Sequence, residues 1–341
     1  MKNVTLRKTE LPRLADFLMK SVQVLAPRRK GEHFVFDEIK DSKDAVREYP
    51  TTILPPKKFF QPPRETPLKF KLDTQEAEAP PPVEGTRALL GVHPCDMAGL
   101  LRLDWAFTQG EPEANWIERR KATLVFGVSQ EPDEYVFSNS VEANNPVKGY
   151  DGFFFVHGAY YVISLYTKAA EKLMSGFDGF QPASEAEVAA ARQNFERATH
   201  RQSKKLDVPV ATLPLLLKGT FNHDEWTDVA ERCVSCGQCT LVCPTCYCFD
   251  VDDSLAFDLS GGERKRRWDS CQLHDFTIVA GEHTFREKRE NRAKHRVYRK
   301  FKYLVEEGGW KCFCVGCGRC IRACPADIDI VDICNNINAS S

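Results

Sequence analysis

Two short segments of the sequence carry the same arrangement of four thiols. In each, three cysteines recur at every third position, and a fourth follows four residues later, directly before a proline. The first run is Cys233, Cys236, Cys239 and Cys243, and the second is Cys314, Cys317, Cys320 and Cys324. Runs of this kind bind 4Fe–4S clusters, because three thiolates on one turning loop reach three corners of the same cube. The spacing therefore predicts one-electron transfer chemistry.

The fourth cysteine of each run is expected to bind the cluster of the other run, as it does in two-cluster ferredoxins. This rule predicts two 4Fe–4S clusters with interleaved ligands. One cluster would be bound by Cys233, Cys236, Cys239 and Cys324, and the other by Cys314, Cys317, Cys320 and Cys243. Zinc sites are the main alternative, but they favour two separated pairs of ligands. Disulfides are disfavoured because the chain is neither small nor secreted in character.

Gly237 and Gly318 occupy the same place in the two runs. A glycine lets the backbone approach a cluster closely and turn N–H groups toward its sulfur atoms. We therefore expect both loops to bend sharply at these positions.

The elements that position the cysteines differ along the 341-residue chain. Residues 1–200 alternate apolar runs with turns, and they include a strand–turn–helix pattern in "RALLGVHPCDMAGLLRLDWAF" and strand patterns in "KATLVFGVS", "GFFFVHG" and "AYYVISLYT". Ser184, with Glu187 three residues later, predicts a helix start. The predicted class is α+β, with an N-terminal α/β scaffold and docking domain over 1–200 that contains a Pro-rich connector at 73–86.

The remaining chain is predicted to be mostly helical. Residues 201–225 are interpreted as a helical bridge, and residues 226–341 as an α-helical ferredoxin-like domain with two 4Fe–4S clusters. The segment between the two cysteine runs is expected to be largely helical. Its strongly basic part, residues 286–303, is interpreted as a solvated helix face or a docking face for an acidic partner subunit.

Composition excludes several classes of function. The formal net charge is −1, and no stacking aromatic series accompanies the basic segment, so a nucleic-acid partner is not expected. No apolar run approaches the length of a membrane span, and no signal peptide opens the chain, so a cytoplasmic location is expected. The sequence contains neither a Walker loop nor a GxGxxG motif, so the chain is not expected to bind a nucleotide or flavin itself.

Several motifs together resemble one known family. They are "GVHPCDMAGLLRLD", "CPTCYC", "RRWDSCQLHDFTIVAG" and "CVGCGRCIRACPADI". The sequence is similar to the β subunits of cytoplasmic NAD(P)-linked nickel–iron hydrogenases, or sulfhydrogenases, a group that includes the corresponding 4Fe–4S dicluster subunit of anaerobic sulfite reductase. The resemblance implies an iron–sulfur electron-transfer subunit of a heteromeric complex. Its partners would be a flavin subunit that handles NAD(P)H and a catalytic subunit, either a nickel–iron hydrogenase or a sirohaem reductase.

The resemblance favours a hydrogenase complex over a sulfite reductase or another multisubunit anaerobic reductase. It assigns catalysis to the partner, so no catalytic residue is expected on this chain. Two other classes of function are kept as alternatives: a self-contained reductase with an additional centre, and a protein whose clusters are only structural.

The chain departs from the family pattern in its N-terminal half. Relatives carry further cysteines in a segment like "CxPDEYCFC", where this chain has Gln130, Val136 and Ser138. Cys95 is the only cysteine before residue 233, and one thiol cannot hold a cube. An N-terminal cluster is therefore predicted to be absent, and this half is expected to serve as a docking scaffold.

Six thiols remain outside the two runs. Cys246, Cys248 and Cys271 resemble cysteines that the family also carries, and they are either ligands of a third cluster with one non-cysteine ligand or buried structural thiols. The second interpretation is preferred. Cys312 and Cys334 are interpreted as packed or surface thiols, and so is Cys95, although His93 and Asp96 beside it make an isolated ligand conceivable.

Overall fold

The computed structural model describes residues 2–46, 48–79 and 83–340, and it combines helices with strands as the α+β class predicts. Residues 80–82 of the predicted 73–86 connector lie outside the described residues. The division into domains near residues 200 and 225 stays a prediction. Among the described residues, no helix has the length and apolar character that crossing a membrane requires.

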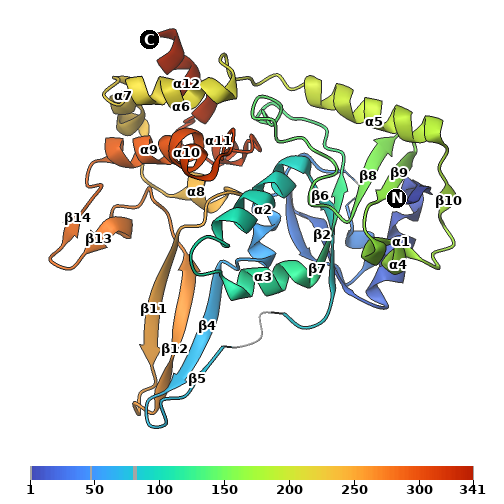
Figure 1. Ribbon diagram of the computed structural model, residues 1–341, viewed down its shortest axis with the longest axis horizontal. Helices are drawn as coiled ribbons and strands as arrows, with labels where there is room; N and C mark the ends of the chain where they lie inside the picture. The colour runs from blue at the N-terminus through green and yellow to red at the C-terminus, as the bar shows by residue number, and fades with distance from the viewer. Residues whose placement is uncertain (1, 47, 80–82, 341) are drawn as a thin grey trace.

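An eight-stranded mixed sheet forms the body of the N-terminal half (Figure 1). Its strand order is β10-β1-β9-β8-β7-β6-β2-β3, and the four strands β8, β7, β6 and β2 run parallel to one another. The central strands are buried almost without interruption, as parallel strands covered on both faces must be. The bounds are β1 Lys2–Arg7, β2 Gln23–Lys30, β3 His33–Glu38, β6 Arg87–Val92, β7 Thr123–Val128, β8 Gly152–His157, β9 Tyr160–Leu165 and β10 Gln181–Pro182.

Five helices pack on this sheet. Three of them, α2, α3 and α5, contact its central strands. Helix α2 has Pro94 at its first position, where the missing N–H costs no hydrogen bond, and α5 has the predicted capping box between Ser184 and Glu187. The bounds are α1 Leu11–Met19, α2 Pro94–Ala106, α3 Ala114–Lys121, α4 Lys168–Met174 and α5 Glu185–His200.

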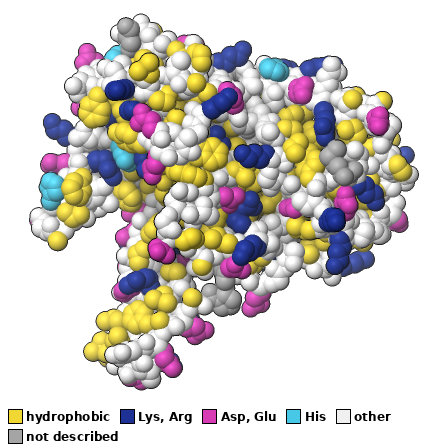
Figure 2. All heavy atoms as spheres, in the orientation of Figure 1, with side chains coloured by type: hydrophobic (Ala, Val, Ile, Leu, Met, Phe, Trp, Pro, Cys, Tyr) yellow, Lys and Arg dark blue, Asp and Glu magenta, His cyan; other side chains and the backbone are white. Residues whose placement is uncertain are grey.

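A second, four-stranded sheet projects from the body as an arm (Figure 1). Its order is β11-β12-β4-β5, with bounds β4 Arg64–Lys71, β5 Ala77–Glu78, β11 Phe249–Leu255 and β12 Gly261–Trp268. Strand β4 from the first quarter of the chain thus pairs with β12 from the last third. Apolar side chains gather at the tip of the arm (Figure 2), where Phe257 is fully exposed and Leu255 and Leu259 are more than half exposed.

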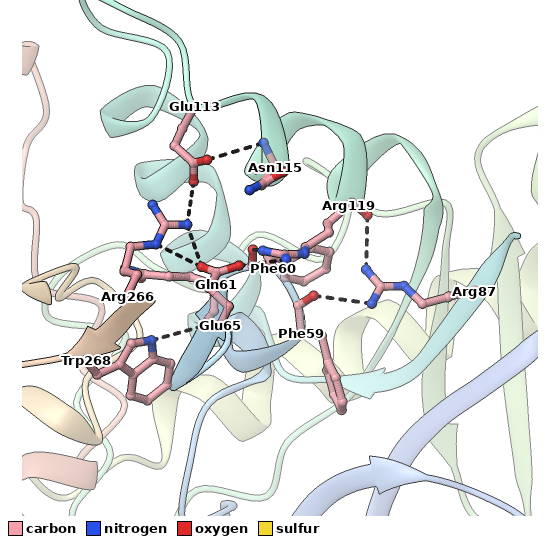
Figure 3. Close-up of polar contacts among 10 residues, drawn as sticks. All are labelled: Phe59, Phe60, Gln61, Glu65, Arg87, Glu113, Asn115, Arg119, Arg266 and Trp268. Carbon is pink, nitrogen blue, oxygen red and sulfur yellow. Dashed lines mark hydrogen bonds and ion pairs between the residues drawn. The ribbon is translucent and has the colours of Figure 1, made fainter. Parts of the chain in front are cut away.

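A buried ion network fastens the arm to the body (Figure 3). Glu65 on β4 accepts from Arg119 of α3 at 2.7 Å and from Nε of Arg266 on β12 at 2.8 Å, and Arg266 also reaches Glu113 at 2.9 Å. Trp268, at the end of β12, donates its indole N–H to the carbonyl of Gln61 at 3.0 Å. Both long strands of the arm that meet the body, β4 and β12, are therefore fixed at its base.

The C-terminal part gathers short helices and one small hairpin around a second apolar core that includes Trp226, Tyr298 and Phe301. The longest helical segment runs from Arg289 to Gly308 with a π-helical turn at Arg299–Tyr303. The bounds are α6 Leu213–Gly219, α7 Glu225–Arg232, α8 Gln238–Leu241, β13 Ile278–Val279, β14 His283–Thr284, α9 Arg289–Tyr298, α10 Leu304–Gly308, α11 Arg319–Arg322 and α12 Ile330–Ala339.

The prediction of a largely helical segment between the cysteine runs is wrong for residues 249–268. This stretch forms the β11–β12 hairpin, in which Asp253 pairs with Arg264 and Asp250 with Arg267 across the strands. Charged residues on both faces hid the strand pattern, because these strands are stabilised by cross-strand pairs rather than by an apolar face.

Candidate metal centre

The two cysteine runs fold into loops of the same shape. The backbone adopts positive φ twice in each loop, at Ser235 (54°) and Gly237 (78°) in the first and at Gly316 (61°) and Gly318 (74°) in the second. Each loop then enters a short helix, α8 or α11, and these two helices pack against each other. A Cβ atom on Gly318 would also lie 2.7 Å from backbone atoms of Tyr135, so both conformation and space demand glycine there.

Backbone N–H groups point at thiol sulfur atoms in this region. The N–H of Ser235 lies 3.5 Å from Sγ of Cys233, and the N–H of Gly316 lies 3.4 Å from Sγ of Cys314. Cys324 accepts from the N–H of Ile328 at 3.3 Å. Such donors stabilise a thiolate that ligates a cluster and tune its potential, so the loops suit metal-bound sulfur.

Four of the predicted ligands surround one cavity. Cys233, Cys236 and Cys239 come from the first run and Cys324 from the second, and all four line the same space. Burial raises the pKa of Cys239, Arg296 opposes this, and the thiols of Cys233 and Cys324 raise it further. We refer to these four cysteines as the outer quartet, because Cys236 is exposed.

The other four predicted ligands also gather together. Burial raises the pKa of Cys320, which Arg296 opposes, and the thiols of Cys317, Cys314 and Cys243 add to the increase. Cys243 is thus a close neighbour of the second run although it belongs to the first. We call Cys243, Cys314, Cys317 and Cys320 the inner quartet, since Cys317 is buried and the other three are half-buried.

The inner quartet is anchored on helix α2 by a buried ion pair. Arg319, between Cys317 and Cys320, donates to Asp96 Oδ2 at 2.7 Å and to the carbonyl of Thr52 at 2.8 Å. Asp96 is fully buried and Arg319 nearly so. Arg102 of the same helix donates to the carbonyl of Cys312 at 2.8 Å. The N-terminal half therefore supports the second cysteine run directly.

The basic helix does not present the solvated face that its sequence suggests, and that prediction is wrong. Arg292, Lys294, Arg296 and Lys300 are each no more than 7% exposed. Burial alone would lower the pKa of Arg296, but the thiols of Cys239 and Cys320 outweigh it and raise the pKa. Arg296 therefore lies within electrostatic reach of both quartets, with its charge directed inward.

Two more buried cations face the thiols. Burial would lower the pKa of Lys300, but Cys243 and Cys246 raise it, whereas burial prevails for Lys57 and lowers its pKa to about 8. Lys57 is 2% exposed. The sequence analysis missed all three cations as part of the site. The available signal was the spacing of Arg292, Arg296 and Lys300, which repeats every four residues and so lies on one helix face.

Replacing Arg296 by methionine is expected to lower the reduction potentials of the centres that both quartets would hold. The charge lost is worth about 1 kcal/mol to the reduced state, or roughly 50 mV for a one-electron couple. Redox titration followed by electron paramagnetic resonance measures this shift. Lys302→Met is the control, because Lys302 lies on the same helical segment and pairs with Glu306 at its surface. Equal shifts in both variants would contradict the role given to Arg296.

The thiols without a predicted role in the runs are mostly buried. Cys312 and Cys334 are fully buried in the second core, in agreement with packed structural thiols. Cys95 is also buried, and its thiol lies 3.8 Å from Oε1 of Gln130, one of the residues that replace the cysteines of relatives. Cys246, Cys248 and Cys271 instead line a separate cavity of about 260 Å³.

Comparison with known proteins agrees with this arrangement. Residues 232–328 match the family model described as a 4Fe-4S dicluster domain, which spans both cysteine runs. The chain is 33% identical to "Sulfhydrogenase 2 subunit beta" of Pyrococcus furiosus over 345 aligned residues, covering 99% of this chain and 98% of that protein. No solved structure matched the chain. The cysteine loops and the near-complete alignment together show that this chain belongs to the sulfhydrogenase β-subunit family.

Proposed function

We propose that this chain is the electron-transfer subunit of a heteromeric hydrogenase complex. It relays electrons between a flavin subunit that handles NAD(P)H and a catalytic nickel–iron subunit. The observation that carries the proposal is the pair of adjacent thiol quartets, each completed by a cysteine from the other run. The printed name of the relative favours a sulfhydrogenase complex over a sulfite reductase.

The outer quartet would hold one 4Fe–4S cluster and the inner quartet the other. A 4Fe–4S cluster accepts and releases one electron at a time. The protein contributes eight thiolates, the N–H donors of the two loops and the charge of Arg296, which is directed at both quartets. This cation offsets part of the negative charge that thiolate-bound clusters bring into a buried site.

One end of the proposed relay reaches the surface. Cys236 of the outer quartet is exposed, and its neighbour Val234 is 61% exposed. A partner that docks here would come close to the outer quartet. The exposed apolar tip of the arm, with Phe257, is a second surface of the kind that partner proteins cover.

The test uses the complex purified anaerobically through a tag on this chain. The purified complex is expected to contain flavin and nickel. In a Cys320→Ala complex, we expect hydrogen-driven reduction of NAD(P)⁺ to fall to background, because the relay is interrupted. Hydrogen oxidation with a dye that reacts at the catalytic subunit should persist, and so should NAD(P)H oxidation with a dye that reacts at the flavin.

Two outcomes would contradict the proposal. If the Cys320→Ala complex kept full hydrogen-driven reduction of NAD(P)⁺, the thiol quartets would be structural only. If sirohaem co-purified in place of nickel and flavin, the partner assignment would be wrong. A Cys334→Ala complex, altered at a buried thiol outside both quartets, is the matched control and should behave as the wild type.

A further inference from the structure

Three thiols outside the quartets line a cavity of their own. Cys246 and Cys248 come from the loop between α8 and β11, and Cys271 comes from the turn after β12. The cavity has a volume of about 260 Å³ and is also lined by Arg296, Lys300 and His295. One of its lining residues, Phe249, is exposed, so the cavity lies near the surface at the base of the arm.

The base of the arm holds these thiols in place. Phe249 pairs with Trp268 in the β11–β12 ladder, and the N–H of Asp269 donates to the carbonyl of Cys248 at 3.0 Å. Cys248 and Cys271 therefore emerge side by side and share a thiol hydrogen bond. The buried network around Glu65 fixes β12 from the other side (Figure 3).

Buried cations surround the three thiols without an anion to balance them in their closest contacts. Lys57 donates to the carbonyl of Cys246, and Lys300 donates to Oγ1 of Thr245 at 2.6 Å, so both partners are neutral oxygens. A buried cation is costly unless an anion offsets it. Thiolates that carry an anionic inorganic group in the cavity would supply that balance.

The spacing of the side chains argues for a group larger than one ion. Within the described parts of the chain, no set of three or more His, Cys, Asp or Glu side chains converges as the ligands of a single metal ion do. Three thiols around an open volume suit a cluster of several atoms better. His295 offers a non-cysteine ligand, because burial, Arg286 and Arg299 lower its pKa to about 4 and keep the imidazole neutral.

The location also fits a gap in the relay. The outer quartet reaches the surface at Cys236, but the inner quartet is covered by the N-terminal half. Cys246 shares a hydrogen bond with Cys243 of the inner quartet, so the cavity begins directly beside it. A centre in this cavity would continue the path from the inner quartet to the base of the arm.

We propose that Cys246, Cys248 and Cys271 hold a third iron–sulfur centre, which extends the relay from the inner quartet toward the surface at the arm. This inference rests on the proposed function, since a third relay station has a purpose only beside the two quartets. The competing possibility is that Cys248 and Cys271 form a dithiol that oxidises to a disulfide.

The experiment counts iron and acid-labile sulfide in the full-length chain purified anaerobically. We expect about twelve iron atoms per wild-type chain and about eight in Cys248→Ser and Cys271→Ser, because each cube contains four. Serine preserves the size and hydrogen bonding of the buried thiol. Cys334→Ser is the control and should retain about twelve, and the resonance signals of the two quartets should survive in both test variants.

Each outcome has a distinct meaning. About eight iron atoms in the wild type would overturn the third centre and leave the two quartets intact, and a Cys248–Cys271 disulfide in that protein would identify the dithiol instead. About twelve in both test variants would overturn it as well, since the additional iron would lie elsewhere. Fewer than eight in the wild type would contradict the two quartets themselves. The wild-type count is informative even if a variant does not fold.

Discussion

Replacing Cys243 by alanine is expected to remove the cluster associated with the C-terminal cysteine run, more than 70 residues away in sequence, and to leave the cluster of its own run in place. The reason is the crossed arrangement, in which Cys243 lies with Cys314, Cys317 and Cys320. We expect a loss of about four iron atoms per chain, with only one of the two quartet resonance signals remaining. The mirror variant Cys324→Ala should lose the other signal.

The two signals are assigned with variants inside each run. The spectrum of Cys243→Ala should match that of Cys317→Ala, and the spectrum of Cys324→Ala should match that of Cys236→Ala. If Cys243→Ala matched Cys236→Ala instead, each run would hold its own cluster and the crossed wiring would be wrong. Cys312→Ala removes a buried thiol adjacent to the second run in sequence, and it should keep both signals.

The second large effect is expected at the ion pair beneath the inner quartet. Asp96→Asn leaves the guanidinium of Arg319 buried without its counter-charge, and breaking such a pair costs about 3–5 kcal/mol. Asp96 contacts Arg319 through both carboxylate oxygens, and neither residue is more than 2% exposed. Because Arg319 lies between two ligands, the inner cluster should bleach at a lower guanidinium concentration than the outer one.

A double variant separates charge from packing. Asp96→Asn combined with Arg319→Met removes the orphaned charge and should recover most of the lost stability, since apolar replacement of a buried pair is often neutral. Asp253→Asn breaks the exposed pair with Arg264 on the arm and should change stability by at most about 1 kcal/mol. If Asp96→Asn were as mild as Asp253→Asn, Arg319 would not depend on this carboxylate.

The sequence was informative where one side chain pattern determines the local structure. The buried runs at 87–92, 123–128 and 152–157 predicted strands, and all three form strands of the large sheet. The capping residues Ser184 and Glu187 predicted the start of α5 correctly. The glycines of the cysteine loops likewise have the positive φ angles that close approach to a cluster requires.

The predictions failed where the partner lies far away in the chain. Strand β12 is charged along both faces and is stabilised by β4 and by Glu65, about 200 residues earlier, which no local pattern can reveal. The basic helix was misread for the same reason. Its charges at Arg296 and Lys300 looked suited to water, but their counter-charges are thiols from both cysteine runs.

The pairing of β4 with β12 has a consequence for the order of events during synthesis. Strand β4 leaves the ribosome roughly 200 residues before its partner, which corresponds to about 10–40 s at ordinary rates of elongation. During that interval its free edge can join the strand of a neighbouring nascent chain. High-level expression should therefore favour inclusion bodies, and slower translation should improve the yield of folded protein.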